Sequence, residues 1–153
     1  MNASVRIRAA APGDIPDLIR LLTELVSLES DFDTGPEQME KGLRLLLSDP
    51  ESRRIFVAES GGAVAGMCAG QVFPSSAEGG LVLLVEDFVV TESERGRGLG
   101  KKLIRAVEAW GREKGAKRFQ LLADRDNAEA LEFYRRQGWA RSGLTYLFKR
   151  SKP

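Results

Sequence analysis

A glycine-rich turn between a strand and a helix constrains this chain more than any other feature. The apolar run from Leu81 to Val90 is rich in β-branched residues and is interrupted only by Glu86 and Asp87, a pattern typical of a buried strand. It is followed by the turn Gly96-x-Gly98-x-Gly100 and then by a helical pattern. Because glycine lacks a Cβ atom, the N–H groups of such a turn can bend around an anion at the start of a helix. The turn therefore predicts a phosphate-binding site.

The spacing of the glycines argues against two common nucleotide-binding motifs. A P-loop requires Gly-x-x-x-x-Gly-Lys-Ser/Thr, but Arg95 replaces the first glycine and Lys102 replaces the hydroxyl residue. A dinucleotide fingerprint requires Gly-x-Gly-x-x-Gly, but Gly100 comes one residue early and Lys101 stands in its place. A mononucleotide-binding domain is therefore disfavoured.

Two motifs in sequence order resemble the signatures of the GNAT superfamily of N-acetyltransferases. The first, Arg95-x-x-Gly98-x-Gly100 after the strand, resembles the family's pyrophosphate-binding motif for acetyl-coenzyme A. The second lies about 30 residues downstream and consists of Asn127, Phe133-Tyr134 and Gly138-Trp139. The resemblance extends over roughly residues 53 to 150.

The hydrophobic periodicity along the chain agrees with this resemblance and predicts one α/β (α+β) domain over residues 1–153. Strands are expected at 5–9, 55–58, 63–73, 81–90, 119–123, 139–141 and 144–149, and helices from 15 to 26, near 39–47, from 99 to 114 and at 127–137. The segment 74–80 is expected to be a mobile connection. The resemblance implies a GNAT fold: a mixed, mostly antiparallel sheet of about seven strands flanked by four helices, splayed between the fourth and fifth strands.

Composition narrows the classes of function. The chain has 153 residues, with 23 basic and 22 acidic ones, so its net charge argues against bulk electrostatic binding to nucleic acid or to anionic membranes. Its single cysteine, Cys68, cannot form an internal disulfide and is expected to be a buried packing residue. The sequence starts without a basic-then-apolar leader and has no apolar run of about 18 residues. We expect a cytoplasmic protein with no nucleic-acid or membrane partner, and we leave a homodimer open.

The absence of histidine limits the choice of a catalytic base to a carboxylate, a water chain or no base at all. Glu86 interrupts an apolar strand, where desolvation would raise its pKa. By resemblance to family members with a glutamate on this strand, Glu86 is the candidate base, acting through water. The alternative is that it pairs with an arginine and only positions the substrate. Asp87 points to the opposite face by strand alternation and is expected to be structural.

The resemblance also assigns a proton donor. Tyr134 matches the family tyrosine that reaches the coenzyme sulfur, and an unperturbed tyrosine is protonated at neutral pH. The alternative for Tyr134 is a core tyrosine whose hydroxyl binds elsewhere. Asn127 matches a position that binds the pantetheine region, and asparagine is also a good helix N-cap. Asp126 with Glu129 is expected to form a capping box for that helix.

The resemblance implies acetyl-coenzyme A as co-substrate and no metal. Backbone groups of Phe88, Val89 and Val90 are expected to pair with the pantetheine amides, with the Phe88 N–H as oxyanion donor. The resemblance implies that the cofactor-binding residues of the turn are Arg95, Gly96, Arg97, Gly98, Leu99, Gly100 and Lys101. Cations at a helix N-terminus oppose the macrodipole unless an anion is present, which favours a ligand there.

These observations predict an N-acetyltransferase that transfers the acetyl group to a primary amine of a small molecule by direct attack in a ternary complex. The acidic residues Glu29, Asp31 and Asp33 follow the first helix, where the family places the acceptor entrance, so we expect an acceptor with more than one amine. A solvated acidic loop is the alternative. Two other functions stay open: a non-catalytic acyl-coenzyme A-binding regulatory protein, and a transferase acting on a protein N-terminus or lysine.

Overall fold

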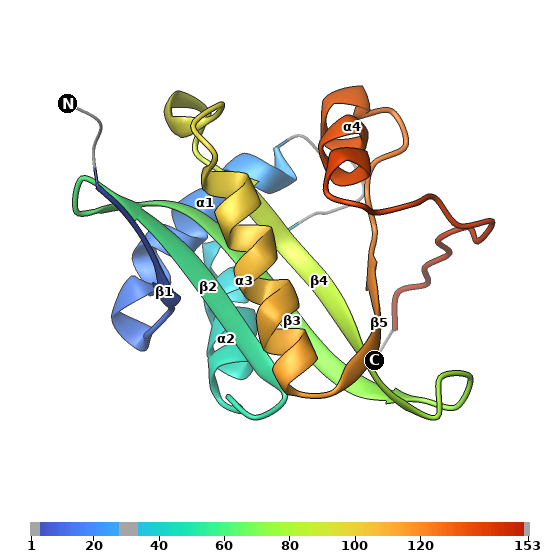
Figure 1. The fold of residues 1–153 in the computed structure, drawn as a ribbon. Helices are drawn as coiled ribbons and strands as arrows, with labels where there is room; N and C mark the ends of the chain where they lie inside the picture. The colour runs from blue at the N-terminus through green and yellow to red at the C-terminus, as the bar shows by residue number, and fades with distance from the viewer. Residues whose placement is uncertain (1–3, 28–33, 152–153) are drawn as a thin grey trace. The chain divides into compact units, whose positions relative to one another are not determined.

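The computed structural model describes residues 4–27 and 34–151 (Figure 1). The chain divides into two units, Met1–Leu121 and Leu122–Pro153. The acidic residues Glu29, Asp31 and Asp33 lie outside the described residues. The prediction of a single domain stays a prediction.

A mixed sheet forms the centre of the first unit. Its strands are β1 (Val5–Ala9), β2 (Arg53–Ser60), β3 (Ala63–Ser75), β4 (Gly80–Val90) and β5 (Ala116–Leu121). They lie in the order β1-β2-β3-β4-β5, and each pair is antiparallel except β4 and β5, which are parallel. The five strands of the described residues agree with the expected mixed, mostly antiparallel sheet, although seven strands were expected.

Helices cover both faces of this sheet. The elements are α1 (Ile15–Val26), α2 (Pro36–Leu47) and α3 (Leu99–Glu113), with short 3-10 helices η1 (Pro12–Asp14) and η2 (Glu92–Glu94). The apolar stripes of α1 and α2 pack in one core cluster with Met67, Ala69 and Val89 of the sheet. α3 covers the other face (Figure 1). It lies so close to β3 that a Cβ atom on Gly70 would be 2.9 Å from Val107.

The connection between β3 and β4 differs from the expected mobile segment over 74–80. Strand pairing continues to Ser75 opposite Gly80, so the connection is only a short turn between two long strands. Gly79 adopts φ 64° in this turn, a left-handed conformation that glycine accepts without steric cost. A cluster of small and turn-forming residues predicts a loop, and the strand pairing on both sides of it is not visible in the local sequence.

The second unit contains α4 (Ala128–Arg136). It ends in a Schellman motif, because Gly138 has φ 92° and its N–H binds the Arg135 carbonyl, while the Trp139 N–H binds the Tyr134 carbonyl. At the other end, the Asn127 side chain accepts a hydrogen bond from the Ala130 N–H (3.1 Å). The N-cap is therefore Asn127. The expected capping box, with Asp126 as N-cap, was wrong by one residue.

The two closing strands expected at 139–141 and 144–149 are not present: the described residues 140–151 form neither helix nor strand. Their large apolar side chains are exposed, namely Leu144, Tyr146, Leu147 and Phe148. A period of two in the sequence marks a segment that is able to pair, but a strand forms only where a partner satisfies its backbone groups. The sequence pattern shows that this segment is able to pair and does not show whether a partner strand is present.

Candidate active site

A β-bulge interrupts β4 at the centre of the expected site. Glu86 lies opposite Ala69 of β3 and Val89 lies opposite Met67, so two residues of β4, Asp87 and Phe88, share the space opposite Cys68. Asp87 has φ 52° and is the one non-glycine residue with positive φ among the described residues. Such an extra residue bends a strand and redirects the side chains that follow it.

Glu86 points to the face of the sheet that carries α1 and α2. Residues directly opposite each other in an antiparallel pair share a face, and its partner Ala69 belongs to the core cluster of α1 and α2. The Glu86 side chain keeps an exposed surface, yet the protein atoms around its carboxyl group raise its pKa by desolvation. The direction of this shift is the one predicted for a candidate base.

Cys68 faces the α3 side, because it shares a face of β3 with Gly66 and Gly70, where a Cβ atom would meet Leu103 and Val107 of α3. Burial raises the pKa of the fully buried Cys68 thiol, and the negative charges of Asp87 and of Glu108 on α3 raise it further. Cys68 is therefore the expected unreactive packing residue. The expected position of Asp87 on the opposite face from Glu86 stays a prediction, because the bulge interrupts the regular alternation at this residue.

The glycine turn forms a cradle with room for a ligand. Gly96 has φ 77° and Gly98 has φ 85°, and a Cβ atom on either would meet no atom within 4 Å. Gly98 is the N-cap of α3 and supplies no side-chain cap, and the first turn of α3 contains no acidic residue. The first N–H groups of a helix have no acceptor within the helix. Open space before uncapped donors fits the phosphate groups of a coenzyme. Gly100 lies inside α3 with helical backbone and contributes no special conformation.

Two basic residues of the turn, Arg95 and Arg97, have partners within the protein. Arg95 Nε donates to the Val90 carbonyl (2.9 Å), which ties the turn to the end of β4. Arg97 Nη1 lies 3.4 Å from a Glu94 carboxylate oxygen, and Ser60 Oγ donates to the same oxygen (3.2 Å). Lys101 is exposed on the first turn of α3. The expected cationic surroundings of the cradle are therefore partly offset by Glu94.

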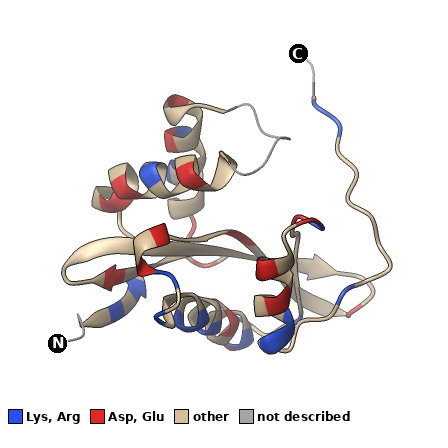
Figure 2. Ribbon diagram, turned by 90° about the horizontal axis from the view of Figure 1, so that it is seen from above, with Lys and Arg blue, Asp and Glu red and all other residues tan. Residues whose placement is uncertain are grey.

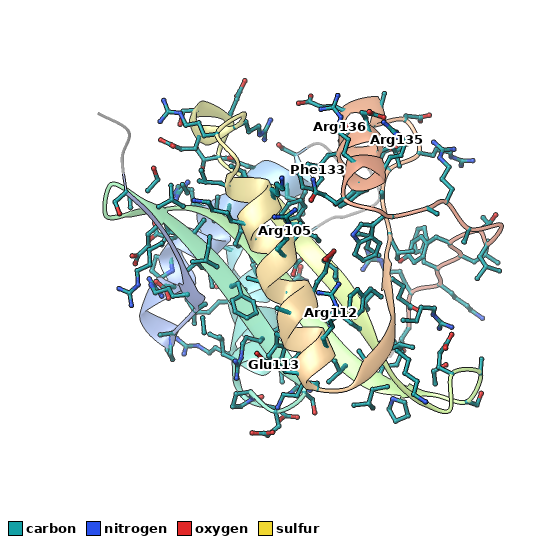
Figure 3. The ribbon with its side chains drawn as sticks, in the orientation of Figure 1. Arg105, Arg112, Glu113, Phe133, Arg135 and Arg136 are labelled. Carbon is teal, nitrogen blue, oxygen red and sulfur yellow. The ribbon has the colours of Figure 1, made fainter. Side chains whose placement is uncertain are left out.

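Charges of both signs are distributed along the helices (Figure 2). Arg105 and Arg112 extend from α3, and Arg135 and Arg136 extend from the last turn of α4, where both bind Glu132 (Figure 3). These two hydrogen-bonded arginines lower the pKa of Glu132 to about 2. Such exposed pairs contribute little to stability.

In the second unit, Tyr134 is half-buried on α4 and lies in a small aromatic cluster. Its ring makes an edge contact with Phe133 (centroids 5.5 Å apart) and a tilted contact with Trp139 (6.3 Å). The contact with Trp139 accompanies the Schellman motif, in which an apolar contact across the helix end is common. The two motif pairs Phe133-Tyr134 and Gly138-Trp139 thus have a local structural reason to occur together.

Arg20 of α1 makes contacts near the candidate site that the sequence pattern does not predict. Its guanidinium reaches Val64 and Thr91, at the start of β3 and just after β4. Nothing in the sequence marks this contact, because Arg20 stands among Asp17 and Glu24 at helical spacing and therefore has the pattern of an ordinary surface ion pair.

Comparisons with known proteins agree with the resemblance of the two motifs to the GNAT acetyltransferases. The sequence model of the Acetyltransferase (GNAT) family matches residues 20–139. The chain is 34% identical over 96 residues to the streptothricin acetyltransferase of Streptomyces lavendulae, which is 63% of this chain and 49% of that protein. It is 30% identical over 147 residues to the thialysine N-epsilon-acetyltransferase of Sus scrofa, covering 89% of this chain and 84% of that protein.

Among solved structures, the chain resembles an aminoglycoside acetyltransferase from an uncultured soil metagenomic sample, solved in complex with trehalose. The TM-score is 0.78 with 25% sequence identity, and the match covers 97% of each chain. The fold is therefore one shared by acetyltransferases. The chain belongs to the Acetyltransferase (GNAT) family, which confirms the resemblance of its two motifs.

Two further findings concern the described residues only. No group of three or more His, Cys, Asp or Glu side chains is arranged to hold a metal ion in this part of the chain. None of the described helices combines the length and the apolar character needed to cross a bilayer.

Proposed function

We propose that this protein is an N-acetyltransferase that uses acetyl-coenzyme A to acetylate a primary amine of a small molecule in a ternary complex. The observation that carries the proposal is the cradle: an uncapped helix N-terminus, opened by the left-handed Gly98, follows a bulged strand after η2 and the glycine turn. A helix N-terminus of this kind binds phosphate groups. Membership of the family supplies the identity of the phosphate ligand.

In this proposal the segment 95–101 holds the pyrophosphate, with N–H groups at the start of α3 as donors. Phe88, Val89 and Val90 pair with the pantetheine arm as an added strand would. The register supports the necessary splay, because β4 pairs with β5 only as far as Val85 opposite Leu121, whereas β4 continues to Val90. Asn127 is proposed to bind the pantetheine region in addition to capping α4.

The coenzyme supplies an acetyl thioester, and the residues of the chain move the protons and stabilise charge. Glu86 accepts the proton of the acceptor amine through a water molecule, and its raised pKa brings it closer to neutral pH. The Phe88 N–H donates to the acetyl oxygen as negative charge develops there. Once the carbon–nitrogen bond has formed, the carbon–sulfur bond breaks, and Tyr134 donates its hydroxyl proton to the departing sulfur.

For the acceptor, we propose a cationic small molecule with more than one amine. The relatives named above act, by their names, on streptothricin, thialysine and aminoglycosides. Glu29, Asp31 and Asp33 of this chain would attract such a molecule electrostatically. Replacing Asp31 and Asp33 by Asn should then raise KM for a polyamine more than KM for a monoamine of similar size.

The test is release of free thiol from acetyl-coenzyme A when amines are added to the full chain. The panel contains polyamines, aminoglycosides, amino acids and peptides with free N-termini. Thiol release that depends on a small amine supports the proposal. Release with peptides alone would assign a protein acceptor. Binding of acetyl-coenzyme A without release with any amine would assign the non-catalytic regulatory function.

A further inference from the structure

Arg20 links helix α1 to the strand ends from which the cradle begins. Its Nη2 donates to the Val64 carbonyl at 2.7 Å, and its Nη1 donates to Thr91 Oγ1 at 3.4 Å. The carboxylates of Asp17 and Glu24 on the same helix lie farther away, at 3.6 and 3.9 Å. The short contact with Val64 therefore determines where the guanidinium lies, and the helix-surface ion pairs are secondary.

Thr91 is the residue at which the sheet ends and the cradle segment starts. Its N–H donates to the Ala65 carbonyl (2.7 Å), which adds one bond to the pairing of β3 and β4. Its own carbonyl accepts the Glu94 N–H (2.9 Å), which closes η2. The position of Thr91 therefore sets the direction in which η2 and the glycine turn leave the sheet.

We propose that Arg20 is a positioning residue for the cofactor cradle, holding Thr91 in place so that the turn presents its N–H groups to the phosphates. The inference rests on the proposed function for the identity of the ligand. Arginine suits this role because its planar guanidinium donates from two nitrogen atoms at once, here to two different segments. A lysine has a single ammonium group on a flexible stem and cannot reproduce that fork.

Loss of a positioning residue has a different effect from loss of an ordinary surface arginine. The Arg20 side chain is 45% exposed, so its removal leaves no large cavity in the core. The effect is expected in the cradle segment: greater motion of residues 91–98 before binding, which must then be ordered when the coenzyme binds. Affinity for coenzyme A should fall while global stability stays nearly constant.

The experiment compares the full-length wild type with Arg20→Gln, Arg20→Lys and Thr91→Val. Arg44→Gln is the matched control, because Arg44 is an exposed helix arginine that binds Glu40 four residues away and lies on α2. Two quantities are measured: amide hydrogen exchange at Glu94 and Arg95 without ligand, and the Kd for coenzyme A by calorimetry. The unfolding midpoint in urea is recorded for each variant.

We expect Arg20→Gln to speed exchange at both amides and to raise the Kd for coenzyme A by about tenfold, the size typical for loss of a hydrogen bond from a charged donor. Arg20→Lys should resemble Arg20→Gln, and Arg44→Gln should match the wild type. The double variant with Thr91→Val should show less than the sum of the single effects, because both residues act through one contact.

Unchanged exchange at Glu94 and Arg95 in Arg20→Gln would overturn the proposal, as would faster exchange across the whole sheet, which indicates a purely structural role. Full recovery by Arg20→Lys would show that charge alone matters and would also contradict it. Failure of the wild type to bind coenzyme A would contradict the proposed function. The exchange measurement needs no ligand and decides the positioning role independently.

Discussion

Glu86 and Val89 lie on the same face of β4 although two residues separate them, because the bulge places both Asp87 and Phe88 opposite Cys68. In a regular strand Glu86 would share its face with Phe88 instead. The bulge therefore keeps Val89 in the core of α1 and α2 while turning the backbone of Asp87 and Phe88 out of the regular ladder. This is the stretch that the proposed function assigns to the pantetheine arm and to the oxyanion.

The bulge predicts an unusual order of stability at position 87. In an ordinary strand alanine is more stable than glycine by about 0.5–1 kcal/mol. At the φ of 52° found for Asp87, alanine carries a steric cost of roughly 1–2 kcal/mol. Asp87→Gly should therefore be more stable than Asp87→Ala by up to about 1.5 kcal/mol. Both variants lose the same carboxylate, so urea unfolding of the pair isolates the backbone effect, and the reverse order would contradict the bulge.

Glu86→Gln should lower kcat by about 100-fold, because the amide keeps the shape of the carboxyl group and cannot accept the proton. In the wild type, kcat/KM should fall as pH drops through the raised pKa of Glu86. This inflection should vanish in Glu86→Gln. A variant that keeps the wild-type pH profile would show that the inflection belongs to the acceptor amine and that Glu86 only positions substrate.

The same pKa shift predicts a dependence of stability on pH. The folded state binds the Glu86 proton more tightly than the unfolded state does. In the unfolded state the pKa of Glu86 is about 4.5. As pH rises from about 4.5 through the raised folded pKa, this group's contribution to the free energy of unfolding is lost. The stability of the wild type relative to Glu86→Gln should therefore decrease over that window. Urea unfolding of both proteins at several pH values measures this difference, and a constant difference would contradict it.

Gly98→Val should abolish binding of coenzyme A, because a β-branched residue does not tolerate φ 85° and its side chain would occupy the open space of the cradle. Gly79→Val is the matched control. Gly79 is also left-handed with φ 64° and open surroundings, but it lies in the β3–β4 turn. Calorimetry should show lost affinity in the first variant alone. Equal affinity in a folded Gly98→Val protein would remove the cradle from the cofactor site.

Tyr134→Phe should lower kcat with little change in affinity for coenzyme A, since it removes a proton needed only as the thiolate leaves. The phenylalanine keeps the ring contacts with Phe133 and Trp139, so α4 should remain folded. Tyr146→Phe is the control, because Tyr146 is the other tyrosine of the chain and is exposed. Equal kcat in the wild type and Tyr134→Phe would exclude Tyr134 from proton transfer.

The order of elements as far as α4, the family and the position of the cradle follow from the amino-acid sequence. Apolar periodicity is a local property that identifies each strand and helix. Gly98 indicates a left-handed backbone conformation, because residues with a side chain avoid that conformation. The Schellman motif at Gly138 was predictable for the same reason. Glycine, asparagine and proline carry backbone information that is readable without knowledge of any partner.

Which residues oppose one another becomes known only from the folded chain. The bulge at Asp87 depends on the register of β4 against β3, and no local pattern marks an extra residue in an apolar strand. The contact of Arg20 with Val64 joins residues 44 positions apart, and the segment 144–149 has a strand pattern without a strand. Each of these outcomes depends on a partner distant in the chain, and strand pairing and long-range hydrogen bonds exist only when that partner is in place.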